Sequence, residues 1–197
     1  MTKAKSFHHG NLKRTLFDVA VSLLDQHGAA GVTIRAVARA ANVSHSAPVN
    51  HYKDRSALLT EIAKQQFELI SDKINKSVSC TSNDPLLRIE AIAQALMDYG
   101  FEYPHRYQLL WRSDLINHKD DDLISVMDAV YDELCANIEL AALNVKFDKH
   151  TIAVALWSMV HGYLDMRHSG MFMALDDKIS RTPRRDAMVK FFLNSLS

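Results

Sequence analysis

The apolar positions of this chain recur every three or four residues, which is the spacing of one face of an α-helix. Between Asn11 and His27, for example, Leu16, Ala20 and Leu24 fall on one side, and Gly28 follows as a stop signal. No segment alternates apolar and polar residues over the length of a strand. The pattern predicts an all-α fold.

The same periodicity, interrupted by turn residues, predicts about nine helices. Asp84 before Pro85 has the form of an N-cap followed by proline at the first helical position, and the acidic run 120–122 suits the positive end of a helix dipole. The segment 80–83 is predicted to be a loop. The predicted helices cover about residues 11–27, 34–41, 45–52, 56–79, 85–102, 104–111, 120–143, 149–168 and 182–197.

The charge of the chain is zero overall but unevenly distributed. Residues 1–55 carry eight Lys and Arg against three acids, giving +5, whereas the other 142 residues carry 15 basic and 20 acidic residues, giving −5. A basic head on an acidic body indicates that the head, and not the body, meets a polyanion.

The two cysteines and the longest apolar stretch bear on where the protein works. Cys80 and Cys135 are far apart and belong to no C-x-x-C motif, which is typical of unpaired thiols in a reducing cytosol. The N-terminus shows no apolar signal segment. The stretch 152–164 is broken by polar residues and is too short to cross a bilayer. We therefore expect a cytoplasmic protein.

The most informative segment runs from Thr33 to Leu59. Thr33 suits a helix N-cap, and Ile34, Val37, Ala38 and Ala41 follow as one apolar stripe in which the small Ala38 allows a second helix to cross closely. Asn42 then suits a tight turn, because asparagine tolerates positive φ. Two short helices joined by such a turn are the helix-turn-helix pattern.

With its flanks, this segment resembles the tetracycline-repressor (TetR) family of bacterial regulators. The resemblance covers about residues 11–59: a helix ending in H-G, then G-V-T-I, then V-S, six intervening residues and H-Y-K-D-R-x-A-L-L. It implies a homodimeric, all-helical regulator, more often a repressor than an activator, that binds a DNA operator and a small-molecule effector. Residues 1–55 would form the DNA-binding domain and residues 56–197 the effector-binding and dimerisation domain.

The resemblance also implies which residues touch DNA. Candidates near base edges in the major groove are Ser44, His45, Ser46, Ala47 and Asn50, and positions that fasten to phosphates are Thr33, His51, Tyr52 and Lys53. The basic residues Lys3, Lys5, Lys13 and Arg14 fit tracking of a groove or phosphates. Two residues depart from the family pattern: Val49 replaces a frequent phosphate-binding tyrosine, and Pro48 lies early in the recognition helix, where it is tolerable.

The helix predicted over 151–166 is apolar on nearly all sides, so it must be buried all round. Its outer side would meet a second subunit, and the small residues Ala155, Ser158 and Gly162 would allow close approach there. With Met188 and Phe192 of the last helix, they predict a four-helix dimer interface and hence a palindromic operator. The alternative is that both helices form only intramolecular core.

Aromatic and methionine side chains of the body suggest an adaptable apolar pocket. Its candidates are Met97, Phe101, Tyr107, Trp111, Met127, Tyr131, Trp157 and His161, although ordinary core packing is the alternative for each of them. The charge of −5 disfavours a strongly anionic effector, so we expect an apolar or cationic one. The string W-x-x-x-H-G, 157–162, resembles a feature of one C-terminal subgroup of the family.

No metal, cofactor or catalytic site is expected. His161, Asp165 and His168 share one helix face and offer zinc-type ligands, but the outer two are about 10 Å apart along the axis, so they do not converge on one ion. No nucleophile–base pair or phosphate loop is present in the sequence. The open alternatives are an all-helical enzyme or ligand-binding protein with an incidental helix-turn-helix, and a DNA-binding protein without an effector.

Overall fold

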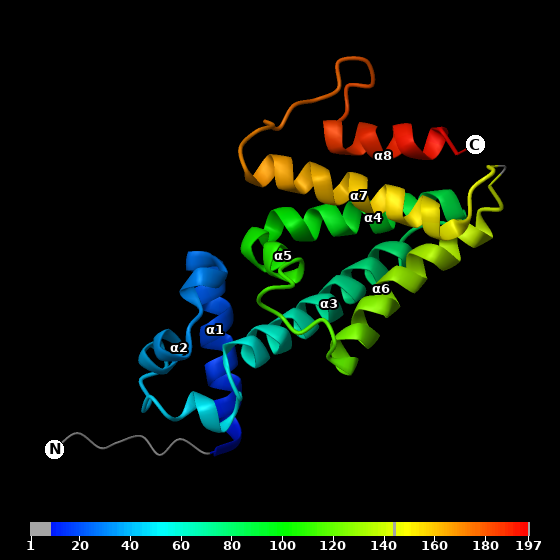
Figure 1. Ribbon diagram of the computed structural model, residues 1–197. Coiled ribbons are helices and arrows are strands. Elements are labelled where there is room, and N and C mark those ends of the chain that lie inside the picture. Colours follow the sequence, from blue (N-terminus) through cyan, green and yellow to red (C-terminus); the bar gives the residue numbers. More distant parts are fainter. Residues whose placement is uncertain (1–8, 144, 197) are drawn as a thin grey trace. The chain divides into compact units, whose positions relative to one another are not determined.

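A computed structural model describes residues 9–143 and 145–196, and the regular elements there are helical (Figure 1). The prediction of an all-α fold is confirmed; strand-type pairing in these residues is limited to an isolated bridge between Asp176 and Pro183. The helices are α1 (His9–Gly31), α2 (Ile34–Ala40), the 3-10 helix η1 (Pro48–Asn50), α3 (Arg55–Ser79), α4 (Pro85–Glu102), α5 (Pro104–Leu110), α6 (Asp121–Leu140), α7 (Lys149–His168) and α8 (Arg184–Asn194).

Helix ends lie where local side-chain chemistry predicts them. Gly28 takes a φ of 65° and interrupts α1 at the predicted stop, although helical turns resume as far as Gly31. Asp84 caps α4 by accepting a hydrogen bond from the Leu86 backbone N–H at 2.9 Å, with Pro85 in the first position. At the start of α6, Asp120 accepts from the Leu123 N–H at 3.0 Å.

The predicted helix over 45–52 is wrong. Residues 45–47 form a turn and only Pro48–Asn50 are helical, in the tighter 3-10 form. Pro48 has no N–H and cannot donate to the carbonyl of Ser44, which instead accepts from Ala47 at 3.0 Å. Hydrogen bonds between residues three apart, from Ala47 to Ser44 and from His51 to Pro48, therefore take the place of a regular α-helix, and one bond between residues four apart, from Tyr52 to Pro48, follows them.

The described chain divides into two compact units. The first comprises the residues up to Gln66 together with His105–Ile124, and the second comprises Phe67–Pro104 and the residues from Ser125 onward. The division by compactness thus places the first half of α3 and most of α5 with the helix-turn-helix. The functional division that we predict at residue 55 concerns roles rather than compactness, and it stays a prediction.

Two arginines form polar contacts that hold the first unit together. The Arg55 guanidinium donates to the carbonyls of Val32 and Ala29, both at 2.7 Å, and so ties the start of α3 to the end of α1. Arg106 of α5 forms two bonds with the carboxylate of Asp25 on α1, at 2.7 and 2.6 Å. These contacts hold α1, α3 and α5 together, and the segment 41–54 is anchored between α2 and α3 of the same unit.

In the second unit, α7 and α8 both pack on α4 (Figure 1). Gly100 lies at the contact of α4 with α7, where a Cβ atom would be 2.6 Å from Cδ1 of Leu164. A larger residue at this position would force the buried Leu164 side chain to shift. No helix in the described residues is long and apolar enough to cross a membrane.

Candidate nucleic-acid interface

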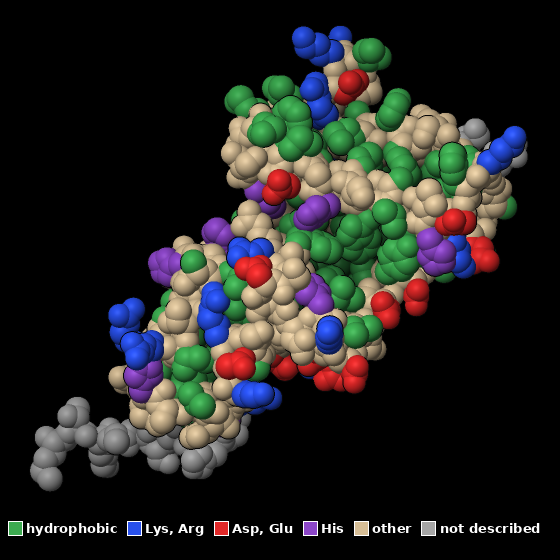
Figure 2. All heavy atoms as spheres, viewed as in Figure 1, with side chains coloured by type: hydrophobic (Ala, Val, Ile, Leu, Met, Phe, Trp, Pro, Cys, Tyr) green, Lys and Arg blue, Asp and Glu red, His purple; other side chains and the backbone are tan. Residues whose placement is uncertain are grey.

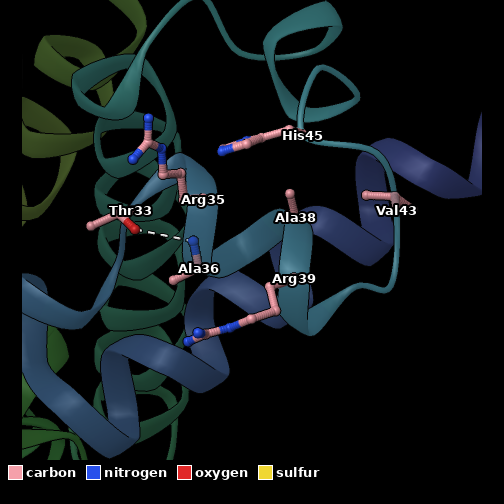
Figure 3. Close-up of a pocket in the computed structure, with 7 residues that line it drawn as sticks. All are labelled: Thr33, Arg35, Ala36, Ala38, Arg39, Val43 and His45. Atoms are coloured by element: carbon pink, nitrogen blue, oxygen red, sulfur yellow. Dashed lines mark hydrogen bonds between the residues drawn. The ribbon is translucent and has the colours of Figure 1, made fainter.

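A hollow of about 460 Å³ marks the surface of the helix-turn-helix (Figure 3). Thr33 lies at its rim as the N-cap of α2, where its hydroxyl oxygen accepts from the Ala36 N–H at 3.0 Å. Because the oxygen acts as acceptor in this bond, the Thr33 O–H proton is left to donate to another group, such as a phosphate. The lining residues are Thr33, Arg35, Ala36, Ala38, Arg39, Val43 and His45.

The turn after α2 brings the chain back across that helix. Asn42 takes a φ of 54°, as predicted, and the Val43 N–H donates to the carbonyl of Ala38 at 3.0 Å. Ala38 itself is buried. Its small side chain permits this close passage, and in Figure 3 the ring of His45 extends over the helix from the far side of the turn.

Most of the predicted base-reading residues are displayed to solvent. Ser44, His45, Ser46 and Asn50 are exposed, and Ala47 is half-buried. They lie in the turn and in η1 rather than on a full helix. Their exposure meets the first requirement for contact with base edges, and their role in reading sequence stays a prediction.

The predicted phosphate-binding residues differ in burial. Lys53 is exposed and His51 is half-buried, but Tyr52 is only 5% exposed and its hydroxyl donates to the carbonyl of Lys13 at 3.4 Å. Burial raises the pKa of Tyr52 to about 12, so the phenol stays protonated. Tyr52 therefore packs within the unit, and a phosphate contact would require its hydroxyl to leave Lys13.

Two arginines of this surface were missed by sequence reasoning. Arg35 and Arg39 are exposed, line the hollow of Figure 3, and form no ion pair within the described residues. Their separation of four residues places them on one face of α2, opposite the buried Val37. That spacing could have identified them as a candidate pair of hydrogen-bond donors to DNA phosphates.

The basic residues of the N-terminal end are only partly described. Lys13 lies over the Tyr52 ring at 5.8 Å, and Arg14 pairs with Asp18 at 2.9 Å. Lys3 and Lys5 lie outside the described residues. Figure 2 shows Lys, Arg and His side chains over much of the visible face of the part that holds α1 and α2.

Comparison with known proteins assigns the chain to a family. Residues 16–62 match the family described as bacterial regulatory proteins, tetR family, and residues 89–189 match the tetracyclin repressor-like C-terminal domain. This chain belongs to the TetR family. The predicted resemblance is therefore confirmed, whereas membership of the subgroup with the W-x-x-x-H-G string stays a prediction.

Curated relatives of this TetR-family chain carry regulator names. The HTH-type transcriptional regulator Rv1816 of Mycobacterium tuberculosis is 29% identical over 133 residues, which is 64% of this chain and 56% of the relative. The uncharacterized HTH-type transcriptional regulator YobS of Bacillus subtilis is 26% identical over 99 residues, 50% of this chain and 51% of the relative. The chain thus matches only about half the length of these relatives.

Solved structures share the fold. A protein of unknown function from Rhodococcus sp. RHA1 superposes with a TM-score of 0.81 at 24% identity, over 98% of this chain and 99% of the other. AibR, solved in complex with isovaleryl coenzyme A and operator DNA, gives a TM-score of 0.66 at 15% identity over 94% and 97%. At these identities the likeness concerns the fold alone.

The eight pocket candidates of this TetR-family chain belong to different compact units. Tyr107 and Trp111 lie in the first, with ring centroids 5.6 Å apart, and the other six lie in the second. Within the second unit Met97 is buried, and the Tyr131 and Trp157 centroids are 6.5 Å apart. Met127 and His161 are half-buried, and burial lowers the pKa of His161. A pocket formed by all eight stays a prediction.

The predicted dimer stripe is open on the single chain. Ala155 and Ser158 are exposed, and a Cβ atom at Gly162 would meet nothing within 4 Å. Nearby Val154 is 54% exposed and Phe191 of α8 is 77% exposed, whereas Met188 and Phe192 are half-buried. The apolar α7 is thus not covered all round by its own chain, as the dimer prediction requires. Among the described residues, no three His, Cys, Asp or Glu side chains gather closely enough to hold a metal ion.

Proposed function

We propose that this TetR-family protein binds duplex DNA through α2 and residues 44–53, and that it regulates transcription in the cytoplasm as a repressor released by a small molecule. The observation that carries the proposal is a basic surface without internal partners: within the described residues, Arg35, Arg39 and Lys53 form no ion pairs. Such cations gain most from displacing counterions on a polyanion.

The comparisons support the same role. The curated relatives are named as HTH-type transcriptional regulators, and AibR was solved with operator DNA. These names describe regulators and no enzyme, and we propose no catalytic step for this chain. The solved AibR complex also contains isovaleryl coenzyme A, which supports an effector as the second ligand class.

The exposed apolar residues of α7 and α8 support a dimer. In this arrangement the side of α7 that carries Val154, Ala155 and Ser158 meets the same side of a second copy, and the exposed Phe191 of α8 takes part in the interface. Two heads related by a twofold axis would dock on half-sites about one helical turn apart, so the operator should be palindromic.

The test starts with selection of bound fragments from a genomic DNA pool, which identifies the operator. Binding of that operator is then measured as a function of salt for the parent chain and for Lys53→Gln. Each lost phosphate contact should reduce the slope of log K against log salt by about 0.9, so Lys53→Gln should reduce it by up to about two in a dimer.

The matched control is Lys76→Gln, which removes an exposed lysine of α3 in the second unit. It should leave both affinity and slope unchanged. A parent chain that selects no DNA, or a Lys53→Gln chain that keeps the parent slope, would contradict the proposed surface.

A further inference from the structure

A cavity of about 340 Å³ in the second unit combines arginines with aromatic rings. It is formed by the end of α4, the end of α7, the segment 174–176 and the start of α8. Its volume lies within the roughly 300–1,000 Å³ that is usual for small-molecule sites. The lining residues are Phe101, Tyr163, Arg167, Ala174, Leu175, Asp176, Pro183, Arg184 and Arg185.

Arg167 keeps unused hydrogen-bonding capacity in this cavity. Its guanidinium lies 5.2 Å from the centroid of the Phe101 ring and 6.0 Å from that of Tyr163. Its one described hydrogen bond is a long one, from Nη1 to the Tyr163 hydroxyl at 3.4 Å, and its Nε is buried without a partner in the described residues. A guanidinium has five N–H donors, so most of them remain available to an acceptor.

Arg184 is a second guanidinium without a carboxylate partner. It donates from Nη2 to the backbone carbonyl of Asp176 at 3.3 Å, and none of the ion pairs of the described residues includes it. The nearby carboxylate of Asp177 is occupied by the backbone N–H groups of Ile179 and Ser180, at 3.0 and 2.7 Å. Arg184 therefore adds positive charge at the mouth of the cavity.

Arg185 differs, because carboxylates already neutralise it. It pairs with Asp98 on α4 and with Asp186 beside it. Its role is to fix the start of α8 against α4, while Arg167 and Arg184 keep their charge for a ligand. The rest of the lining is mostly apolar, from Leu175, Pro183 and the ring of Phe101, and it includes one carboxylate, the exposed Asp176.

We propose that this cavity binds a small organic carboxylate with an apolar body, held by Arg167 and Arg184 with the apolar part against Phe101. The planar fork of a guanidinium matches a carboxylate, and the aromatic rings beneath it orient the fork. Arg185 is already paired with Asp98 and Asp186, so Arg167 and Arg184 face one remaining lining carboxylate, that of Asp176. The local charge of the lining is therefore positive, although residues 56–197 carry −5. The site does not depend on the DNA-binding role, because it can be tested without DNA.

The test is calorimetric titration of the full chain with 3-phenylpropionate and with the uncharged 3-phenylpropionamide of the same shape. The carboxylate should bind at least tenfold more tightly than the amide, as expected for charge-assisted hydrogen bonds. Arg167→Gln should abolish that preference. Arg184→Gln, at an exposed position where a substitution disturbs packing less, should reduce it.

The matched control is Lys178→Gln, which removes a positive charge from the same segment outside the cavity and should keep the preference. Equal binding of acid and amide would overturn the proposal, and so would an equal loss in Lys178→Gln and Arg167→Gln. Inorganic phosphate that binds as tightly as 3-phenylpropionate would overturn the apolar contribution. Failure of operator binding would leave all of these results unaffected.

Discussion

The arginines of the helix-turn-helix and those of the cavity in the second unit carry the same group in different surroundings. Arg35 and Arg39 project from an exposed helix face into water. Arg167 lies over the ring of Phe101, and its Nε is buried. In water each charge is screened, so useful affinity needs many contacts with a polyanion. Beside apolar rings a single guanidinium interacts more strongly, so one small anion is a sufficient partner.

The two regions should therefore respond independently to substitution. Loss of the exposed arginines should affect DNA alone, and loss of Arg167 should affect the small carboxylate directly. Arg106 and Arg185 show a third environment, in which paired carboxylates give the guanidinium a structural role.

The largest effect is expected for Arg35→Gln combined with Arg39→Gln. Two charged contacts are lost from each head, so operator affinity should fall about 100-fold or more, with an equal loss for random duplexes. Binding of 3-phenylpropionate should not change. Fluorescence anisotropy with labelled DNA measures the affinity for DNA, and calorimetry measures the affinity for 3-phenylpropionate.

The matched control for that pair is Arg35→Lys with Arg39→Lys, which keeps the charge and should keep most of the salt dependence. A double glutamine variant with the parent affinity for DNA would show that α2 does not face the phosphates.

Gly162→Leu should have the next largest effect, on dimerisation and through it on operator binding. In the single chain a Cβ at Gly162 meets nothing within 4 Å, so a side chain can begin at this position, and we expect its clash to arise across the dimer face. Overpacking there should weaken the dimer by about 1–3 kcal/mol and reduce operator binding with it. Sedimentation equilibrium measures the dimer constant.

Gly162→Ala, a smaller addition, should have a smaller effect on the same constant. The predicted interface would be contradicted by a parent chain that sediments as a monomer at micromolar concentration, or by a leucine variant that dimerises normally.

Breaking the ion pair of Arg106 with Asp25 should have a smaller effect than the preceding substitutions, and the effect should be on the free energy of unfolding. The two side chains are 17% and 37% exposed, between a buried and a surface pair. Arg106→Gln should lower the free energy of unfolding by about 1–2 kcal/mol, whereas Arg112→Gln should have a much smaller effect, because its pair with Asp114 is more than half exposed and is screened by water. Urea denaturation compares them, and equal losses would contradict the structural role of Arg106.

Sequence predicted the elements that local chemistry determines. Gly28, Asp84 and Asp120 mark helix ends through their own backbone or side-chain preferences, and these ends lie at or within a few residues of the expected positions. The prediction of a helix over 45–52 was wrong because Pro48 lacks an N–H, and this changes the hydrogen-bond pattern of the segment. The predicted helix to 143 stops at Leu140, and Ala142 takes a positive φ of 46°.

Contacts between distant residues could not be predicted in the same way. Tyr52 matches a phosphate-binding position of the family, but in the fold its hydroxyl donates to the carbonyl of Lys13, 39 residues earlier. The cavity around Arg167 joins four separate segments, and no periodicity relates Phe101 to Pro183. The net charge of residues 56–197 does not predict the charge at one cavity, because electrostatic attraction at short range depends on the nearest groups.

Tyr52→Phe tests that family-based expectation directly and should have the smallest effect. Because the Tyr52 hydroxyl already donates to the carbonyl of Lys13 through a long bond, its removal should cost less than about 1 kcal/mol of stability and change operator affinity less than about threefold. A tenfold loss of affinity would show instead that the hydroxyl turns to a phosphate.

Burial raises the pKa of Tyr52 from 10.0 to about 12, so between these values the folded chain holds a proton that the unfolded chain releases. The contribution of this phenol to stability is therefore complete below pH 10 and is lost as the pH rises towards 12. The difference in unfolding free energy between the parent and Tyr52→Phe, measured by urea denaturation at each pH, should fall over that interval; a constant difference would mean that the phenol is not buried in solution.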